Sequence, residues 1–160
     1  MEKDFLKELE YLGITARLKR MSDSLSYNIK ELYKMKDIDI EPSWHLVFLI
    51  LKKHKTITMT EIADAFHISQ PGITKMITKM KKKGYINIRT NGNDNRKKQV
   101  ELSQKGLKEL PKFEKIWNAG QQSIKDMLEA NKEFLISLEK FEKQIKYKNF
   151  KDRTINHLKK

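Results

Sequence analysis

The sequence predicts a mainly α-helical protein with a small β-hairpin, and three observations support this fold class. Apolar residues recur at helical spacing through most of the 160-residue chain. Two short segments in the middle carry helix-start signals and are separated by only a few residues. Two β-prone runs with a polar connection follow them directly. Two short helices followed by a hairpin indicate a winged helix-turn-helix, and the helical flanks then lie on either side of it.

The first predicted helix runs from Lys3 to about Lys36. This segment lacks proline, and its single glycine, Gly13, is not expected to end the helix. A helix of roughly thirty residues would be about 45 Å long, more than a chain of this size can cover by itself. A partner is therefore expected along its two apolar stripes, formed by Phe5, Leu9, Leu12 and Ala16 and by Ile14, Leu18, Met21 and Leu25.

Residues 37–41 are expected to break this helix, and Pro42 opens a second one with the sequence SWHLVFLILKKH. Because this second helix is apolar nearly all round, we expect it to form the core beneath the helix-turn-helix.

The helix-turn-helix is predicted from its capping residues. Thr58 and Glu61 form a T-x-x-E capping box at the start of the first short helix. His67 stands in the turn, where a positive φ is needed and where His is better tolerated than most residues. Ser69 can cap the second short helix, and Pro71 lies in its first turn, where a missing N–H costs nothing.

The second short helix is predicted to have two faces. One is an apolar stripe with helical spacing, formed by Ile73, Met76, Ile77 and Met80. The opposite face carries Pro71, Lys75, Thr78 and Lys82, flanked by Gln70, Thr74 and Lys79. A helix of this kind suits the major groove of DNA, where its first residues reach base edges and its lysines reach phosphates. The alternative is an ordinary amphipathic surface helix, whose solvent face is also usually rich in lysine.

The runs Tyr85–Thr90 and Lys97–Ser103 are predicted strands, and NGNDNR between them is rich in residues that tolerate positive φ. Residues 42–103 therefore form the predicted winged-helix core.

After this core, Ser103 can cap a further helix that Pro111 should kink or restart. Asn131 is the expected cap of the last helix, and the Lys-rich tail over residues 149–160 is expected to fray. The last helix has an apolar seam of Phe134, Leu138, Phe141 and Ile145.

These motifs resemble the DNA-binding core of the MarR family of bacterial transcription regulators. The resemblance covers TEIADAFHISQPGITKMITKMKKKGYI and the wing signature, an Asp-x-Arg followed by Leu-Ser-x-x-Gly, which is matched by Asp94, Arg96, Leu102, Ser103 and Gly106. It implies that residues 1–36 and 104–148 are dimerisation helices that interlock two subunits. The alternative is that the terminal helices pack only on each other within one chain.

The charge of the chain points to a polyanion as its partner. The formal net charge is +13 and the isoelectric point is about 9.7. Twelve Lys and Arg but only three Asp and Glu lie between Lys52 and Lys98, a local net charge of +9. Membrane binding or general solubility would not require this concentration of charge in the winged helix.

Other function classes find little support in the sequence. The absence of cysteine excludes disulfides and thiolate–metal sites, and His54 and His157 have no metal-ligand neighbours. The longest apolar run, Leu46–Leu51, is too short to span a membrane, and we expect a cytoplasmic protein. No nucleotide-binding or hydrolase motif is present, so we expect no enzyme activity, no metal and no cofactor.

The expected DNA contacts come from the second short helix and the wing. By the resemblance, Arg96 enters the minor groove, which suits the negative potential of a narrow A·T groove, and Asp94 pairs with a nearby Arg, for which Arg89 is the candidate. The predicted DNA-binding residues are Ser69, Gln70, Pro71, Thr74, Lys75, Thr78, Lys79, Lys82, Arg89, Asn93, Asp94, Arg96 and Lys97.

The resemblance also implies an effector cleft between the first helix, the second helix and the winged helix. An aromatic anion could bind there against Tyr11, Arg17, Trp44 and His45. The alternative for the last two is a packed indole and a hydrogen-bonded imidazole.

The predicted function is a homodimeric, sequence-specific double-stranded DNA-binding transcriptional regulator, a repressor relieved by a small ligand. The alternative function is an architectural protein that binds DNA through charge alone, without sequence preference.

Overall fold

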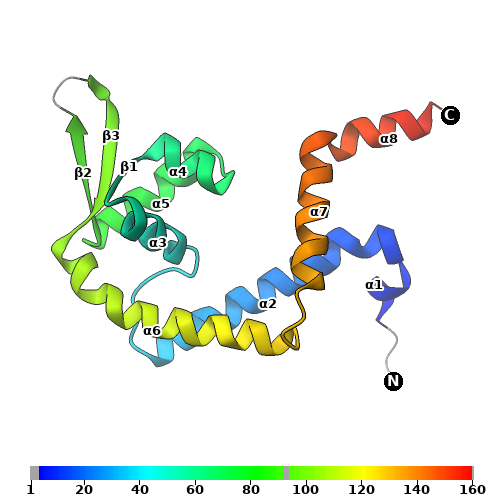
Figure 1. Ribbon diagram of the computed structural model, residues 1–160, viewed down its shortest axis with the longest axis horizontal. Helices are drawn as coiled ribbons and strands as arrows, with labels where there is room; N and C mark the ends of the chain where they lie inside the picture. The colour runs from blue at the N-terminus through cyan, green and yellow to red at the C-terminus, as the bar shows by residue number, and fades with distance from the viewer. Residues whose placement is uncertain (1–3, 92–93, 160) are drawn as a thin grey trace. The chain divides into compact units, whose positions relative to one another are not determined.

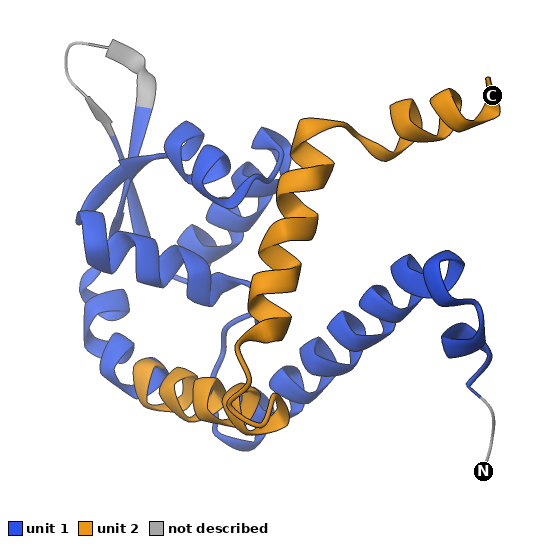
Figure 2. Ribbon diagram, turned by 45° about the vertical axis from the view of Figure 1, so that its right-hand side comes forward, with its two compact units in different colours: residues 1–113 blue, residues 114–160 orange. Residues whose placement is uncertain are grey.

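The computed structural model of the protein describes residues 4–91 and 94–159; within these, the side chains of residues 90–91 and 94–97 are not described. Residues 1–113 and residues 114–160 form two compact units (Figure 2). The first unit contains an N-terminal helical arm, a three-stranded sheet and the helices around it, and the second contains the C-terminal helices (Figure 1). No helix in the described ranges is both long and apolar enough to span a bilayer.

The N-terminal arm is not the single helix that the sequence predicts. It consists of α1 (Phe5–Glu8), the 3-10 helix η1 (Glu10–Gly13) and α2 (Ile14–Met35). The chain turns at Glu10, whose φ is 47°, and Gly13 permits the packing that follows, because a Cβ at residue 13 would lie only 2.2 Å from the carbonyl oxygen of Leu6. Gly13 thus lets the backbone of η1 pack directly against that of α1, a contact that helical periodicity cannot reveal.

An ion pair fastens α1 to α2. The carboxylate of Asp4, which also caps α1, lies 2.7 Å from a guanidinium nitrogen of Arg20. This hydrogen bond is the main reason that the pKa of the Asp4 carboxyl lies below its ordinary value. Both side chains are exposed, so the pair orients α1 and contributes little to overall stability.

Helix α3 (Trp44–His54) lies at the centre of the winged helix, as predicted, but it is not covered on all sides. Val47, Phe48 and Leu51 are fully buried or nearly so, whereas Leu46 and Leu49 remain 37% and 43% exposed. The apolar sequence of α3 therefore predicted its buried face correctly. The prediction that the helix is buried nearly all round was too broad, because one chain leaves part of its surface exposed.

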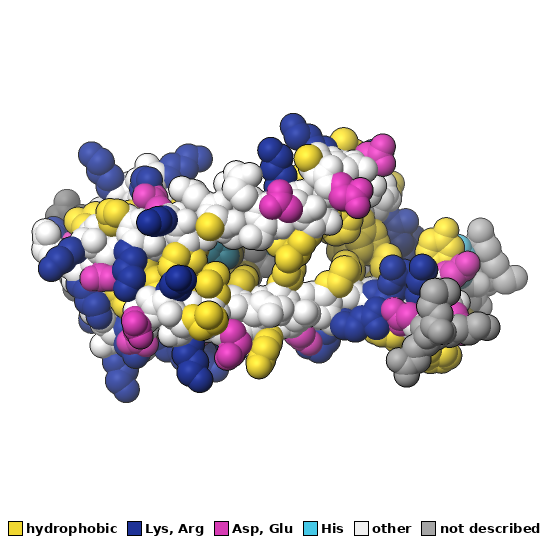
Figure 3. Space-filling view, turned by 90° about the horizontal axis from the view of Figure 1, so that it is seen from below, with side chains coloured by type: hydrophobic (Ala, Val, Ile, Leu, Met, Phe, Trp, Pro, Cys, Tyr) yellow, Lys and Arg dark blue, Asp and Glu magenta, His cyan; other side chains and the backbone are white. Residues whose placement is uncertain are grey.

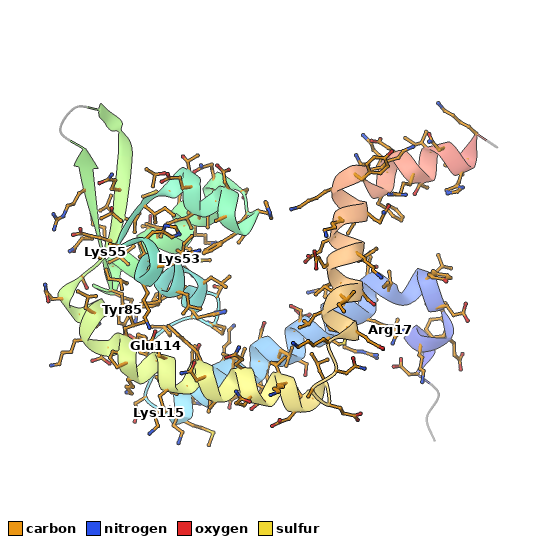
Figure 4. All side chains as sticks on the ribbon, in the orientation of Figure 1. Arg17, Lys53, Lys55, Tyr85, Glu114 and Lys115 are labelled. Atoms are coloured by element: carbon orange, nitrogen blue, oxygen red, sulfur yellow. The ribbon has the colours of Figure 1, made fainter. Side chains whose placement is uncertain are left out.

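An aromatic cluster around Tyr85 holds α3, the sheet and the start of α6 together. The Tyr85 ring packs edge-on against Trp44, Phe48 and Phe113, with ring centroids 5.6–6.2 Å apart, and Phe48 packs on Phe113 at 5.3 Å. Figure 4 shows Tyr85 between α3 and α6. Such edge-to-face pairs add about 0.5–1.5 kcal/mol each to the energy of burial.

The two short helices are α4 (Met59–Phe66) and α5 (Gln70–Lys82), and both predicted caps are present. The Thr58 N–H donates to Glu61 Oε2 at 2.8 Å, and the Glu61 N–H donates to Thr58 Oγ1 at 3.2 Å. His67 ends α4 in the left-handed conformation, with φ 52° and ψ 40°, as predicted for the turn. The helix-turn-helix is thus set by local signals along the chain.

The sheet has three antiparallel strands in the order β1–β3–β2: β1 (Thr56–Thr58), β2 (Ile86–Asn91) and β3 (Asp94–Leu102). The predicted hairpin is β2 and β3, which continue beyond β1 as the wing (Figure 1). Strand β1 was not predicted, because its three residues are too few to show a period. It places Ile57 opposite Val100, which is completely buried.

Helix α6 (Gln104–Met127) begins at Ser103, the predicted cap. The Gly106 N–H donates to Ser103 Oγ at 3.0 Å, and the Ser103 hydroxyl donates to the Gly84 carbonyl at 2.5 Å. One side chain therefore caps α6 and ties it to the turn between α5 and β2. The helix continues through Pro111 without restarting.

The second unit contains the end of α6, then α7 (Glu133–Tyr147) and α8 (Phe150–Leu158). Asn131 accepts a hydrogen bond from the Glu133 N–H at 2.7 Å, although Lys132 occupies the cap position of α7. The prediction that residues 149–160 fray is wrong for α8. Asn149 caps this helix, and Arg153 donates to the carbonyls of Gln144 and Lys148, which fixes α8 to the end of α7.

Candidate nucleic-acid interface

Helix α5 has the two faces that its sequence predicts. Ile73, Ile77 and Met80 have no exposed surface and attach the helix to the core. The polar residues proposed to contact DNA are all exposed: Ser69, Gln70, Pro71, Thr74, Lys75, Thr78, Lys79 and Lys82. A buried apolar back thus presents a front of hydroxyl, amide and ammonium groups to the surroundings.

The first turn of α5 is built to bring its backbone and short side chains to the surface. Ser69 caps the helix by accepting from the Gly72 N–H at 3.4 Å, and Pro71 occupies the first turn. A Cβ at Gly72 would lie 3.0 Å from the Ile68 side chain, which favours glycine here for close packing on the turn. Gln70, Thr74 and Lys75, the residues expected to hydrogen-bond to base edges, are exposed in the first two turns.

Two lysines near the end of α5 form ion pairs with the segment that joins α2 to α3. Lys79 Nζ lies 2.7 Å from Glu41 Oε1, and Lys83 Nζ lies 2.5 Å from Asp39 Oδ2. All four side chains are about half exposed or more. The sequence did not reveal these pairs, because their members lie 38 and 44 residues apart.

At the wing, Arg89 forms an ion pair with Glu101. Its guanidinium lies 2.7 Å from the carboxylate of Glu101, which lies two residues beyond Gln99, the residue of β3 that pairs with Arg89. The proposed partner Asp94 has a side chain outside the described residues, as have Arg96 and Lys97, and Asn93 lies outside them altogether. The pair with Glu101 leaves the Arg89 side chain 70% exposed on the wing.

The four proposed effector residues are not gathered into one cluster. Tyr11 is 88% exposed in η1, and Arg17 lies near the start of α2 (Figure 4). Trp44 is only 2% exposed and packs on Tyr85, and its indole N–H has no hydrogen-bond partner among the described residues. His45 Nδ1 lies 2.7 Å from the Pro42 carbonyl oxygen. The packed indole and hydrogen-bonded imidazole are the alternative that the sequence left open.

A hollow of about 570 Å³ lies instead at the end of α2 and along the segment that follows it. Its apolar part is formed by Tyr33, Ile38, Ile40 and Pro42, and Lys30 and Lys34 extend from the exposed side of α2. Its remaining lining residues are acids: Asp37, Asp39 and Glu41. The acids that pair with α5 therefore also line this hollow.

Tyr85 connects the interface to the core. Burial is the main reason that the pKa of the Tyr85 phenol lies above its ordinary value, and the carboxylates of Asp39 and Glu109 raise it further. The Lys105 ammonium lies 4.2 Å from the centre of the Tyr85 ring. Within the described ranges, no group of three or more His, Asp or Glu side chains is placed to hold a metal ion.

Comparisons with known proteins agree with this geometry. Residues 38–97 match the sequence model of the MarR family. The chain is 26% identical over 114 residues to the HTH-type transcriptional repressor IacR of Pseudomonas putida, an alignment that covers 71% of this chain and 67% of the relative.

Solved structures share the fold at low sequence identity. The S. aureus MepR–DNA complex has a TM-score of 0.73 at 19% identity and covers 82% of this chain and 97% of its own. A mutant E. coli MarR complexed with operator DNA has a TM-score of 0.64 at 19% identity, with 89% and 99% covered. BldR of Sulfolobus solfataricus has a TM-score of 0.59 at 21% identity, with 90% and 100% covered. The winged helix of this chain is therefore similar in sequence to the MarR family over residues 38–97, and the chain shares its fold with these structures.

Proposed function

We propose that the protein is a sequence-specific double-stranded DNA-binding transcriptional regulator that acts as a homodimeric repressor. The observation that carries the proposal is helix α5, whose buried stripe fixes it to the core while its polar face stays exposed next to a basic wing. A helix presented in this way fits the major groove, and its lysines then reach the flanking phosphates. The related IacR is named a transcriptional repressor, and the similar MepR and MarR structures contain DNA.

The wing supplies the second contact. Arg89 is exposed on β2, and the sequence places Arg96 and Lys97 on the strand that follows the turn. A wing Arg in a narrow minor groove would add recognition of groove shape to the base contacts of α5. The regulator works by occupying DNA in the cytoplasm, with no chemical step of its own.

Dimerisation is supported by apolar side chains that remain exposed in each unit. On the face shown in Figure 3, hydrophobic side chains are exposed along the helices. In the first unit they include Phe5, Leu12, Ile14, Met21 and Leu25, and in the second Phe134, Leu135, Phe141, Ile145 and Phe150. Exposed apolar surface of this extent is typical of an interface, and a second copy of the chain is the occupant that links two recognition helices for two half-sites.

The test is the selection of genomic fragments by the purified protein, followed by competition with bulk DNA. A sequence-specific regulator enriches one motif and keeps a large preference for it as salt increases, although its absolute affinity falls. If no motif is enriched and all DNA competes equally, the architectural alternative replaces the proposal.

We also infer that a small amphipathic anion relieves repression. The hollow beside α2 is large enough for such a molecule and offers apolar side chains together with the exposed Lys30 and Lys34. Of its three acids, Asp39 and Glu41 are already paired with lysines, which reduces their repulsion of an anion. An effector acts only through its different affinities for the DNA-bound and free conformations, typically about 1–3 kcal/mol of coupling.

Salicylate-like aromatic acids are the probes for this inference, with release of operator DNA as the measurement. Loss of release in a Lys30→Ala, Lys34→Ala double variant would place the effector in the hollow. Loss only in a Trp44→Phe, His45→Leu double variant would place it at the start of α3. If no acid releases DNA from the wild-type protein, repression is not relieved by this class of molecule.

A further inference from the structure

The segment between α2 and α3 holds two acidic side chains against the recognition helix. Asp39 and Glu41 alternate along this segment, and their carboxylates contact the ammonium groups of Lys83 and Lys79 at 2.5 and 2.7 Å. The two lysines are four residues apart and therefore lie on the same side of α5. The segment between α2 and α3 thus neutralises the charges of two lysines along one side of α5, while the other exposed lysines of the helix point to the surroundings.

This edge borders the face proposed to contact DNA. On a helix of 3.6 residues per turn, Lys79 lies about 60° around the axis from Lys82. Lys82 is exposed, and Lys79 remains 48% exposed despite its pair with Glu41. A phosphate beside the groove that receives α5 would therefore meet Lys79 while a carboxylate already occupies its ammonium group.

The two ion pairs are weak enough to be exchanged. Pairs between exposed side chains contribute little in water, because the charges are well solvated and the long side chains lose entropy when fixed. A DNA phosphate can therefore displace the carboxylate, at a cost in affinity. The displaced carboxylate also remains near the DNA, where it repels the backbone.

We propose that Asp39 and Glu41 are internal competitors of the DNA backbone, which lower the charge-driven affinity of the protein for any DNA by occupying Lys83 and Lys79. This inference rests on the proposed function, because it concerns the strength of DNA binding through α5. Non-specific binding arises almost entirely from phosphate neutralisation. Pairing these lysines with acids of the same chain therefore weakens non-specific DNA binding. The base contacts expected from Gln70 and Thr74 do not involve these lysines and are not weakened.

The test compares two double variants with the same change in charge. Asp39→Asn with Glu41→Gln removes both competitors. Asp23→Asn with Glu139→Gln is the matched control, because it removes two exposed acids whose partners are Lys19 at 2.9 Å and Lys143 at 2.6 Å and not lysines of the recognition helix. Affinity for an operator selected by the wild-type protein and for bulk DNA is measured over a range of salt concentrations.

We expect the Asp39→Asn, Glu41→Gln variant to bind bulk DNA about two- to tenfold more tightly than the control variant at low salt. Its plot of log affinity against log salt should be steeper by about 0.9 for each lysine that gains a phosphate. Adding Lys79→Gln and Lys83→Gln should abolish the gain, because the released lysines are then absent.

Three results would overturn the proposal: equal affinities and slopes for the two double variants, a gain that persists without the two lysines, or weaker DNA binding when the acids are removed. The last result would mean that the pairs position α5 for binding. If the wild-type protein binds no DNA, the proposed function itself fails. If it binds and only the double variants disagree with expectation, the proposed function stands without this inference.

Discussion

Gly106 packs directly on the backbone of Tyr85: a Cβ at residue 106 would lie 2.3 Å from the Tyr85 carbonyl oxygen. This contact brings the first turn of α6 against the residue that precedes β2. Ser103, which hydrogen-bonds to the Gly84 carbonyl and to the Gly106 N–H, fixes the same junction. The Leu-Ser-x-x-Gly pattern that ends the wing is therefore a packing device that fixes the wing to α6.

Changing Gly106 to Ala should lower the free energy of unfolding by about 1–3 kcal/mol, because the added methyl group must displace backbone. Gly120→Ala in the same helix is the control, since no atom lies within 4 Å of a Cβ built there. It should stabilise the chain by about 0.5–1 kcal/mol through helix propensity. Chemical denaturation measures both, and equal effects of the two changes would contradict the close contact.

Tyr85 should make stability fall at alkaline pH. The folded protein raises the pKa of this phenol above its ordinary value, chiefly by burial. The neutral, protonated form is favoured in the native state, so the contribution is complete below the unfolded pKa of about 10 and is lost as pH rises through the folded pKa. Tyr85→Phe should reduce the loss of stability above about pH 10. Tyr11→Phe, at an exposed tyrosine, should leave the pH profile unchanged.

Changing Lys82 to Ala should weaken binding to all DNA sequences alike. If Lys82 contacts a phosphate, its loss should reduce the salt dependence by about one unit for each half-site. Lys108→Ala removes the same charge from an exposed position on α6 and serves as control. Salt titrations of operator and non-operator DNA measure the slopes. A loss confined to the operator would show that Lys82 reads bases instead.

Changing Arg96 to Ala should weaken specific binding by about 1–3 kcal/mol, if the Arg enters the minor groove. The wing would then lose contacts that depend on groove shape, so the preference for A·T-rich flanks should fall with affinity. Arg96→Lys keeps the charge and tests whether charge alone suffices. An equal loss on every sequence would mean that the wing contacts only phosphates.

Changing Leu138 to Asp should disrupt the dimer and weaken DNA binding with it. Leu138 lies half-buried within the apolar seam of α7, and a charge there would have to lose its water in an interface. Ser137→Asp adds the same charge at the exposed neighbouring position. Sedimentation should give twice the 19.0 kDa of one chain for wild type and Ser137→Asp, and less for Leu138→Asp. A wild-type mass of 19.0 kDa at micromolar concentration would contradict the dimer.

The sequence by itself determined the features whose signals lie within one or two helical turns. The capping box of Thr58 and Glu61, the left-handed His67 and the two faces of α5 are all present as predicted. Each of these features depends on residues three or four positions apart, so interactions within one helical turn largely determine it. The order of motifs that resembles the MarR family can be read from the sequence for the same reason.

Only the tertiary structure decided the contacts between distant segments. Strand β1 exists because Ile57 pairs with Val100, and the N-terminal helix turns back at Glu10 so that Gly13 packs on the Leu6 carbonyl. The pairing of Lys79 with Glu41 likewise joins segments with no shared pattern. Such contacts depend on how whole helices and strands pack together. No periodic pattern in the sequence predicts the distant partner of a glycine, of a three-residue strand or of a single acid.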